Sequence, residues 1–299
     1  MPGEIEIVGE LGRMARAIPR SGVALGIGDD CAIFRPRAGE ELLFTTDLLL
    51  EDVHFRRANH SPEAVGHKAL ARGLSDIAAM GGVPRFCLVS LAAPPDRLWI
   101  RRFYRGLLAL ADAHGTALAG GDLARSERIA CDIVVCGAVP RGTALRRDGA
   151  RAGDEIWVSG RLGGSALGLD TGKGKAFRRH LRPEPRLCLG AFLRTRLKAT
   201  AAMDLSDGLS LDLHRMCLAS GTAASIEAPP AYSGATLAQA LHGGEDYELL
   251  FTVRPGTRVP PAFEGTPLAR IGAMRKGAAG EILLAGKPLP PAGWDHFRP

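Results

Sequence analysis

Residues 61–91, SPEAVGHKALARGLSDIAAMGGVPRFCLVSL, place a helical pattern directly before an apolar strand pattern. Ser61 and Pro62 are typical of a helix start, and the Gly-Gly-Val-Pro sequence at 81–84 predicts the helix end. The run that follows, at 86–91, is short, apolar and bounded by turn residues, which favours a buried strand. A helix followed by a buried strand indicates a domain with helices packed on a sheet.

The same alternation continues in both directions along the chain. A second helix is predicted from Asp96 to His114, and further strands at 41–45, 116–119 and 129–139. Later strands are predicted at 155–159, 200–203, 223–227, 247–253 and 281–284. A Gly-rich turn that leads into a helix is predicted within 160–169, and further helices at 206–219 and 237–241. Strands and helices that alternate in both halves predict an α/β or α+β protein. The polar stretch 141–154 is the best boundary, which predicts domains 1–140 and 141–299.

The composition disfavours nucleic-acid binding, membrane association, zinc sites and disulfides. The 299 residues carry 38 Lys and Arg against 32 Asp and Glu, a formal charge of +6, with 46% hydrophobic and 5% aromatic residues. The basic residues are spread and aromatics are few, so no nucleic-acid partner is expected. Apolar runs are too short for a membrane helix or a signal peptide, so we expect a cytoplasmic protein without a membrane partner. Six cysteines without a CxxC pair indicate neither zinc nor disulfides.

Six short segments combine an acid with Gly, Ser or Thr, mostly after predicted strands. Small residues allow close approach of a ligand, and carboxylates beside hydroxyls are the hard oxygen ligands that Mg²⁺ prefers. One such segment alone is typical of helix capping or turn chemistry, but six together favour a site at the strand ends. The segments are GIGDD at 26–30, TTD at 45–47, LSD at 74–76, GGD at 120–122, DLSDG at 204–208 and GGEDYE at 243–248.

Other motifs exclude familiar nucleotide sites. GIGDDC lacks the third Gly of a dinucleotide fingerprint, and LDTGKGK lacks the spacing and hydroxyl of a P-loop. No GxSxG sequence supplies a nucleophile. On the predicted helix Lys68, Arg72 and Asp76 share one face, which is either part of a site or a solvated face with an ion pair.

In this order, GIGDDCAIF, TTDLLLEDVHF, HKALARGLSDIAAMGG, GGD, RRDGARAGDEIWVSG, HLRPEPR, DLSDGL, GGEDYEL and GWDHF resemble the thiamine-monophosphate kinase family. The resemblance covers nearly the whole chain. It implies the two-domain fold of the aminoimidazole ribonucleotide synthetase superfamily, with an N-terminal domain that binds ATP and metal and forms a homodimer, and a C-terminal α/β domain. It also implies transfer of the γ-phosphoryl group of ATP to thiamine monophosphate, which gives thiamine diphosphate and ADP.

The resemblance further implies a role for individual residues. A cluster of several Mg²⁺ ions would be held by Asp30, Thr45, Thr46, Asp47, Asp76, Asp122, Asp204 and Asp207. ATP would contact Tyr104, Gly121, Asp122, Arg147 and Ser206, and the thiamine phosphate would contact His54, Glu245 and Trp294. No covalent nucleophile or obligate base is implied, because a phosphate acceptor is already anionic near neutral pH. Arg147 alone could equally belong to a basic linker, Glu245 to a turn and Trp294 to a C-terminal anchor.

The chain departs from the family pattern in places, and two other functions stay open. Leu123 follows GGD where the family often has Thr, Gly73 replaces a common Asn, and Glu51 and Asp52 replace Glu-Gly. An enzyme of the same superfamily with another acceptor is one alternative, although the reactive cysteines of the selenophosphate and hydrogenase-maturation relatives have no counterpart, and GGEDYE and GWDHF disfavour a purine role. A non-catalytic nucleotide-binding relative is the other, although every metal acid is present.

Overall fold

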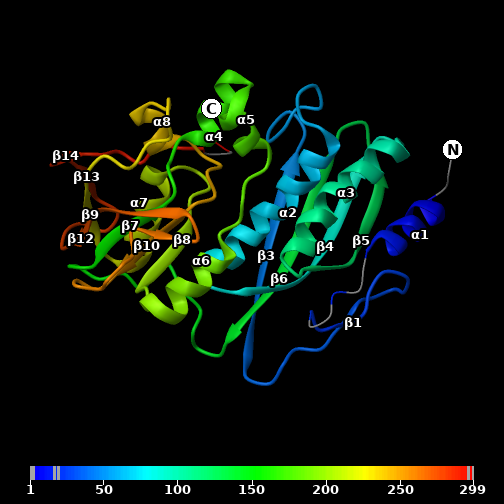
Figure 1. Cartoon of the computed structure of the whole chain (residues 1–299), viewed down its shortest axis with the longest axis horizontal. Helices are drawn as coiled ribbons and strands as arrows, with labels where there is room; N and C mark the ends of the chain where they lie inside the picture. Colours follow the sequence, from blue (N-terminus) through cyan, green and yellow to red (C-terminus); the bar gives the residue numbers. More distant parts are fainter. Residues whose placement is uncertain (1–3, 16–17, 19–20, 295–296, 298–299) are drawn as a thin grey trace. The chain divides into compact units, whose positions relative to one another are not determined.

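The chain folds into two compact units of mixed α/β structure. Unit 1 comprises residues 1–77 and 82–142, and unit 2 comprises 78–81 and 143–299. The computed structural model describes residues 4–15, 18, 21–294 and 297. Each unit has its own sheet and its own helices, as the alternation of patterns in the sequence predicts (Figure 1).

Unit 1 is built on a four-stranded sheet in the order β3-β6-β4-β5, with α2 and α3 lying across it (Figure 1). β6 is antiparallel to both of its neighbours, whereas β4 and β5 run parallel because α3 connects them. The elements are α1 (Glu4–Met14), β1 (Val23–Leu25), β2 (Ile33–Phe34), β3 (Glu40–Leu50), α2 (Pro62–Ala79), β4 (Val83–Ala93), α3 (Arg97–Ala113), β5 (Ala117–Arg125) and β6 (Ala130–Pro140).

The two long helices of unit 1 approach each other closely at glycines. A Cβ atom on Gly66 of α2 would lie 2.0 Å from the carbonyl oxygen of Phe103, and one on Gly106 of α3 would lie 2.0 Å from that of Glu63. Any larger residue at either glycine would force the helices apart. At the start of α3, the Asp96 side chain accepts a hydrogen bond from the Trp99 N–H, the cap expected from the sequence.

Unit 2 is built on a longer mixed sheet in the order β14-β13-β9-β12-β7-β10-β8, to which β11 is added beside β12. Its strands pair antiparallel except for β13 and β9. The elements are β7 (Glu155–Ser159), α4 (Gly164–Thr171), α5 (Gly174–Leu181), α6 (Leu187–Phe192), the π-helix η1 (Leu193–Leu197), β8 (Ala201–Asp204), α7 (Leu209–Ser220), β9 (Ala223–Ile226), α8 (Leu237–His242), β10 (Leu249–Val253), β11 (Ala262–Phe263), β12 (Thr266–Arg275), β13 (Ile282–Leu284) and β14 (Lys287–Pro288).

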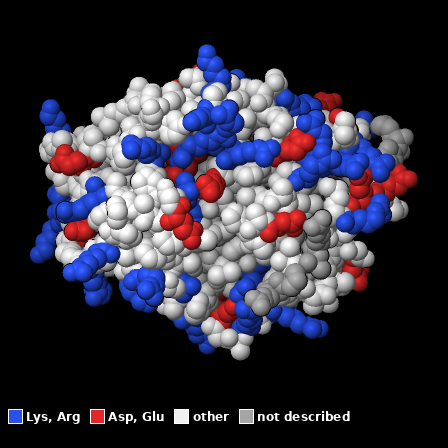
Figure 2. Space-filling view, in the orientation of Figure 1, with Lys and Arg blue, Asp and Glu red and all other residues white. Residues whose placement is uncertain are grey.

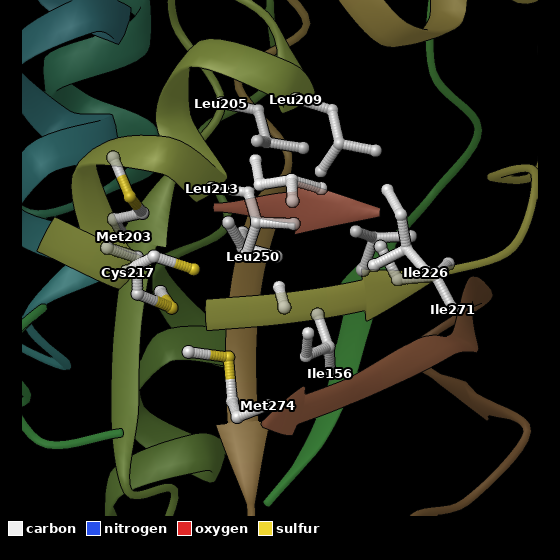
Figure 3. Close-up of a cluster of buried hydrophobic side chains, with 14 of the residues drawn as sticks. Ile156, Met203, Leu205, Leu209, Leu213, Cys217, Ile226, Leu250, Ile271 and Met274 are labelled. Atoms are coloured by element: carbon white, nitrogen blue, oxygen red, sulfur yellow. The ribbon is translucent and has the colours of Figure 1, made fainter. Parts of the chain in front are cut away.

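The core of unit 2 lies between α7 and the sheet (Figure 3). Leu213 on α7 and Ile156 and Leu250 on the central strands have no exposed surface. Burial of each such side chain contributes about 1.5–3 kcal/mol of hydrophobic stabilisation. This core holds the ends of β8 and β10 in place, from which two of the acidic segments extend.

Two acidic segments lie inside strands, whereas the sequence patterns predict them after strands: TTD lies inside β3 and GGD lies inside β5. LSD lies inside α2, the helix on which Asp76 was predicted. The predicted strands therefore end too early, because Gly and Asp are rare in strands and favour turns when the sequence is considered alone. DLSDG does follow a strand, β8, and GGEDYE leads into β10.

Within the described part of the chain, the structure contains no helix that is both long and apolar enough to cross a membrane. On the face shown in Figure 2, Lys and Arg side chains are distributed over the surface with Asp and Glu among them.

Candidate active site

A cavity of about 960 Å³ in unit 1 contains four of the predicted site residues. One part of its wall is apolar and includes Leu11, Phe34 and Leu118. Another part is polar and carries three carboxylates, those of Asp29, Asp30 and Asp122. The predicted residues that line the cavity are Asp30, Tyr104, Gly121 and Asp122. A cavity with an apolar wall and an acidic wall has the chemical character needed for a nucleobase and for a metal-bound polyphosphate.

Gly121 explains how an edge strand can form part of this wall. Its φ is +151°, and a Cβ atom there would lie 1.9 Å from the carbonyl oxygen of Val89 on the paired strand β4. Only glycine fits this position, so the backbone of β5 is bare where it faces the cavity. The next residue, Asp122, is exposed and its Oδ1 accepts a hydrogen bond from the Leu123 N–H at 2.9 Å.

Tyr104 reaches the same cavity from α3, although it is only 2% exposed. Burial raises the pKa of its phenol, and the nearby thiols of Cys131 and Cys87 and the carboxylate of Asp122 add to the effect. The hydroxyl therefore stays protonated and can act as a hydrogen-bond donor at the cavity wall.

Strand pairing places Ser90 and Asp132 close to Asp122, although neither was predicted to be a site residue. Ser90 on β4 lies opposite both Asp122 on β5 and Asp132 on β6. Thr46 on β3 donates a hydrogen bond to Asp132 Oδ1 at 2.7 Å. The sequence signal for Asp132 is an acid inside the apolar run IACDIVVCGAV, which is unusual for a strand.

Thr45 and Asp47 alternate with Thr46 along β3 and therefore face the other side, toward α2. Thr45 Oγ1 donates to Asp76 Oδ2 at 2.5 Å, and Arg72 donates to Asp47 Oδ1 at 2.6 Å. The structure thus places Thr45 and Asp47 of β3 against the face of α2 that carries Asp76. It directs Thr46 to the opposite side of β3.

The α2 face that carries these contacts is not solvated. Lys68 has no exposed surface, and the Arg72 side chain is 11% exposed. Lys68 Nζ donates to the His54 carbonyl oxygen at 3.3 Å, which ties the loop after β3 to the helix. Of the two alternatives for this face, the solvated one is therefore wrong, and Arg72 of this face forms an ion pair with Asp47 on β3.

His54 has a defined tautomer in this loop. Its Nδ1 lies 3.0 Å from the Leu50 backbone nitrogen, whose N–H it accepts. A neutral His54 consequently carries its proton on Nε2, which makes that atom a donor suited to an anionic oxygen.

In unit 2, the DLSDG segment is held by a buried carboxylate. Asp204 ends β8 and is 7% exposed. Asp212 has no exposed surface and accepts the N–H groups of Asp207 and Gly208, both at 3.1 Å. Arg215 donates to both Asp207 and Asp212. Burial, and then the negative charge of Asp207, raises the pKa of Asp212 to about 7.

Three predicted segments of unit 2 meet through backbone hydrogen bonds. The Glu245 N–H donates to the Ser206 carbonyl at 2.7 Å, and the Trp294 N–H donates to the Asp207 carbonyl at 3.1 Å. Ser206, Asp207, Glu245 and Trp294 are thus neighbours although they are up to 88 positions apart in the printed sequence. Trp294 is 50% exposed, so its ring is accessible.

Arg147 lies apart from this group within unit 2. It is exposed, and its carbonyl accepts a hydrogen bond from Ser220 Oγ at 2.8 Å at the end of α7. Its neighbour Arg146 pairs with Asp148, so the guanidinium of Arg147 is the one that an anion can approach from solvent. Among the residues described in either unit, no three His, Cys, Asp or Glu side chains are grouped closely enough to hold a metal ion.

Comparison with known proteins identifies relatives of the chain. Residues 28–142 match the family "AIR synthase related protein, N-terminal domain". The thiamine-monophosphate kinase of Bacillus subtilis is 34% identical over 95% of this chain and 96% of its own. The crystal structure of the enzyme from Stenotrophomonas maltophilia has a TM-score of 0.84 at 35% identity, over 96% of this chain and 98% of that one.

A further solved structure is similar, AaThiL complexed with AMPPCP and TMP. It has a TM-score of 0.79 and 34% identity, over 88% of this chain and 89% of that one. Identity above 30% along nearly the full length of the relatives, together with the shared fold, gives one conclusion: the chain belongs to the thiamine-monophosphate kinase family.

Proposed function

We propose that the chain transfers the γ-phosphoryl group of ATP to the phosphate of thiamine monophosphate, which yields thiamine diphosphate and ADP. The observation that carries the proposal is its full-length similarity to thiamine-monophosphate kinases, including the relative complexed with AMPPCP, an ATP analogue, and TMP. The enzyme is therefore a phosphotransferase with ATP as co-substrate. A phosphate acceptor is anionic near neutral pH, so the reaction needs neither a nucleophilic side chain nor a strong base.

The cavity in unit 1 supports a nucleotide site there. Its apolar wall suits a nucleobase, while Asp30, Asp122 and the bare backbone at Gly121 suit the polyphosphate end. Tyr104 would donate from its protonated hydroxyl. Arg147 and Ser206 of unit 2 are proposed to contact ATP as well, because the exposed guanidinium of Arg147 suits a phosphate.

The chemistry of the proposed donors suits magnesium. Carboxylates and hydroxyls are hard oxygen ligands, and two of the carboxylates line one cavity. The residues that would hold the ions are Asp30, Thr45, Thr46, Asp47, Asp76, Asp122, Asp204 and Asp207. When bound, Mg²⁺ neutralises charge on the phosphates and relieves the repulsion between two polyanions. In the structure Arg72 and Arg215 already neutralise part of the charge of Asp47 and Asp207.

The thiamine phosphate is proposed to contact His54, Glu245 and Trp294. The Nε2–H of His54 suits a phosphate oxygen, the carboxylate of Glu245 suits the thiazolium charge or the ring nitrogens, and the half-exposed Trp294 ring can stack on a planar ring. These contacts would hold the acceptor phosphate in line with the γ-phosphoryl group.

A homodimer formed through unit 1 is part of the proposal. Phe44 and Leu48 lie on the same side of β3 and are 63% and 50% exposed, which is a large apolar area for a free surface. A second copy of the chain would cover it. Sedimentation as a monomer at micromolar concentration would contradict the dimer. The cytoplasmic location stays a prediction.

The test is ADP release by the purified protein with ATP, magnesium and thiamine monophosphate. Release that requires both the monophosphate and magnesium, with an equal amount of thiamine diphosphate, is expected, and thiamine should not replace the monophosphate. Absence of release by folded protein that binds ATP would refute the proposed acceptor. Turnover with another acceptor would then favour a different enzyme of the superfamily, and binding without any turnover would favour a non-catalytic relative.

A further inference from the structure

The segment from Glu245 to Glu248 has an unusual backbone. Glu245 and Tyr247 have φ values of +63° and +50°, a region that non-glycine residues rarely adopt. Residues held in such a conformation persist only where their surroundings fix them. Two of them within three positions mark a segment whose shape is imposed by its neighbours.

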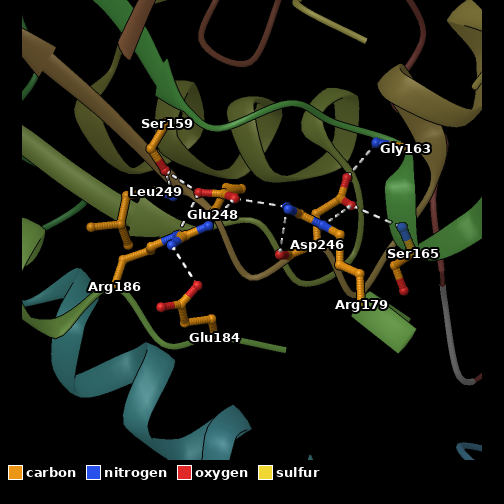
Figure 4. Close-up of polar contacts among 9 residues, drawn as sticks. All are labelled: Ser159, Gly163, Ser165, Arg179, Glu184, Arg186, Asp246, Glu248 and Leu249. Carbon is orange, nitrogen blue, oxygen red and sulfur yellow. Dashed lines mark hydrogen bonds and ion pairs between the residues drawn. The ribbon is translucent and has the colours of Figure 1, made fainter. Parts of the chain in front are cut away.

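Two arginines, Arg179 and Arg186, lie around Glu248 at the end of this segment (Figure 4). Glu248 has no exposed surface. Arg186 donates to its carboxylate from Nε at 2.9 Å and from a terminal nitrogen at 2.7 Å, and Arg179 donates at 2.7 Å. Ser159 Oγ on β7 donates at 2.5 Å. Both carboxylate oxygens are therefore held from three different elements.

The charge state of Glu248 agrees with this geometry. Burial by itself would raise the pKa of the carboxyl, but the hydrogen bonds and charge of Arg186, followed by the charge of Arg179 and the hydrogen bond of Ser159, outweigh burial and lower it. Glu248 is thus ionised at neutral pH and binds both guanidinium groups as a carboxylate. Arg179 lies on α5 and Arg186 ends the HLRPEPR motif, and the proposed function assigned no role to either.

A second anchor lies two residues earlier. Asp246 accepts the N–H of Gly163 at 2.5 Å and that of Ser165 at 3.1 Å, at the start of α4. Arg179 also approaches Asp246, with Nε 3.8 Å from Oδ1 (Figure 4). Arg179 therefore links the two anchored acids, and both lie next to a residue with positive φ.

The anchors fix the segment against the DLSDG loop. Between them, the Tyr247 N–H donates to the Leu205 carbonyl at 2.9 Å, and the Leu205 N–H donates to the Glu248 carbonyl at 2.8 Å. Just before them, Glu245 is tied to Ser206. A shift of Glu248 would consequently move Glu245 as well.

A buried ion pair contributes little net stability, because the cost of removing both charges from water offsets their attraction. The network is better explained by its effect on shape. We propose that Arg186 and Arg179 are positioning residues, which hold Glu248 and thereby fix Glu245 in the conformation that binds the cationic thiamine moiety. This inference rests on the proposed function for the identity of the ligand, and on the contacts of unit 2 for the coupling.

The experiment compares the full-length chain with Arg186→Met and Arg186→Lys. Calorimetric binding of thiamine monophosphate should weaken at least about tenfold in R186M, whereas binding of the ATP analogue AMPPCP should stay within about twofold. R186K keeps the charge but loses the paired hydrogen bonds, so an intermediate loss is expected. The matched control is Arg275→Met, which removes a partly exposed ion pair with Glu281 elsewhere in unit 2 and should change neither affinity.

Amide hydrogen exchange gives a readout that needs no ligand. The N–H groups of Glu245 and Tyr247 should exchange at least about tenfold faster in R186M and R186K, because the contacts to Glu248 hold the loop that carries their acceptor carbonyls. Their exchange rates should not change in R275M. Unaltered exchange at these amides in R186K would overturn the inference, even if R186M failed to fold. Equal thiamine monophosphate binding by wild type and R186M would overturn it as well.

A double variant separates positioning from stability. Arg186→Met combined with Glu248→Gln removes the buried carboxylate charge that only Arg179 would still neutralise, so its melting temperature should recover toward that of the wild type while thiamine monophosphate binding stays weak. Recovery of both would show that the network is only structural. A wild type that binds thiamine monophosphate without turnover would refute the proposed function but not this inference.

Discussion

Unit 1 and unit 2 hold their acidic site residues in different ways. In unit 1, Asp47, Asp76 and Asp122 lie inside regular elements, where the strand or helix period determines their direction. In unit 2, Asp207 and Glu245 lie in loops whose backbones are bound to each other and to buried side chains. Regular elements fix direction through the main chain alone, whereas loops need a supporting network. Side-chain changes next to the site should therefore be tolerated in unit 1 and costly in unit 2.

The strongest test on the unit 1 side is Asp122→Asn. Loss of this carboxylate at the cavity should lower kcat at least about a hundredfold, about 2.7 kcal/mol of transition-state stabilisation, because the amide cannot neutralise a metal ion. Since β5 sets the position of residue 122, the fold should change little. Steady-state kinetics at saturating ATP and thiamine monophosphate would measure the effect.

Asp112→Asn is the matched control, since Asp112 is an exposed acid on α3 of the same unit. It should keep wild-type kinetics. Near-wild-type turnover of D122N would remove Asp122 from the metal site, and a large loss of melting temperature would show that the residue is instead needed for the strand.

On the unit 2 side, the pH dependence of stability tests the supporting network. Burial raises the pKa of Asp246 to about 6 from an ordinary 3.8, against the opposing effects of Arg179 and the Gly163 and Ser165 N–H groups. The folded state therefore binds more protons than the unfolded state between these pH values, so the contribution of Asp246 to stability falls as pH rises from about 4 to 6. Glu248 has the opposite sign, since its pKa is lowered.

Asp246→Asn isolates the contribution of Asp246. The free energy of unfolding of the wild type minus that of D246N should fall by about 2 kcal/mol between pH 4 and pH 6 and then level off. Urea unfolding at several pH values would measure it. A difference that stays constant with pH, or that increases, would show that Asp246 ionises normally in the folded chain.

The contrast between the units also explains what the sequence could predict. Helix and strand periods identified α2, α3, β7 and the fold class, because these depend on local patterns that the sequence displays. Asp122 and Asp207 were selected as site residues for the same reason, because the GGD and DLSDG motifs are local patterns. β12 was missed, since its interruption by Pro267 and Gly272 weakens the strand pattern.

Long-range contacts could not be predicted in the same way. The ends of β3 and β5 were placed too early because pairing with β6 and β4 outweighs the turn preference of Gly and Asp. Nothing local indicates that Glu248 is completely buried between two arginines, or that Ser90 lies beside both Asp122 and Asp132. These neighbours are set by register and packing, which a single sequence does not display.

The smallest expected effect concerns the C-terminal segment of unit 2. Ser210 has no exposed surface, accepts the Ala292 N–H at 3.1 Å and donates to the Ala292 carbonyl. It therefore fastens the chain just before Trp294. Ser210→Ala should raise the KM for thiamine monophosphate about fivefold, near 1 kcal/mol, because Trp294 would lose part of its support while the chemical groups stay in place. The KM for ATP should not change.

Thr195→Ala is a suitable control, since the Thr195 hydroxyl of η1 donates to the Ala191 carbonyl of α6, one turn earlier in the chain. Equal kinetics of S210A and T195A would mean that loops in unit 2 hold their side chains as independently as the strands of unit 1 do. A parallel rise of both KM values in S210A would instead indicate that the C-terminal segment supports the whole unit. Only a selective loss for thiamine monophosphate separates the two ways of placing a functional side chain.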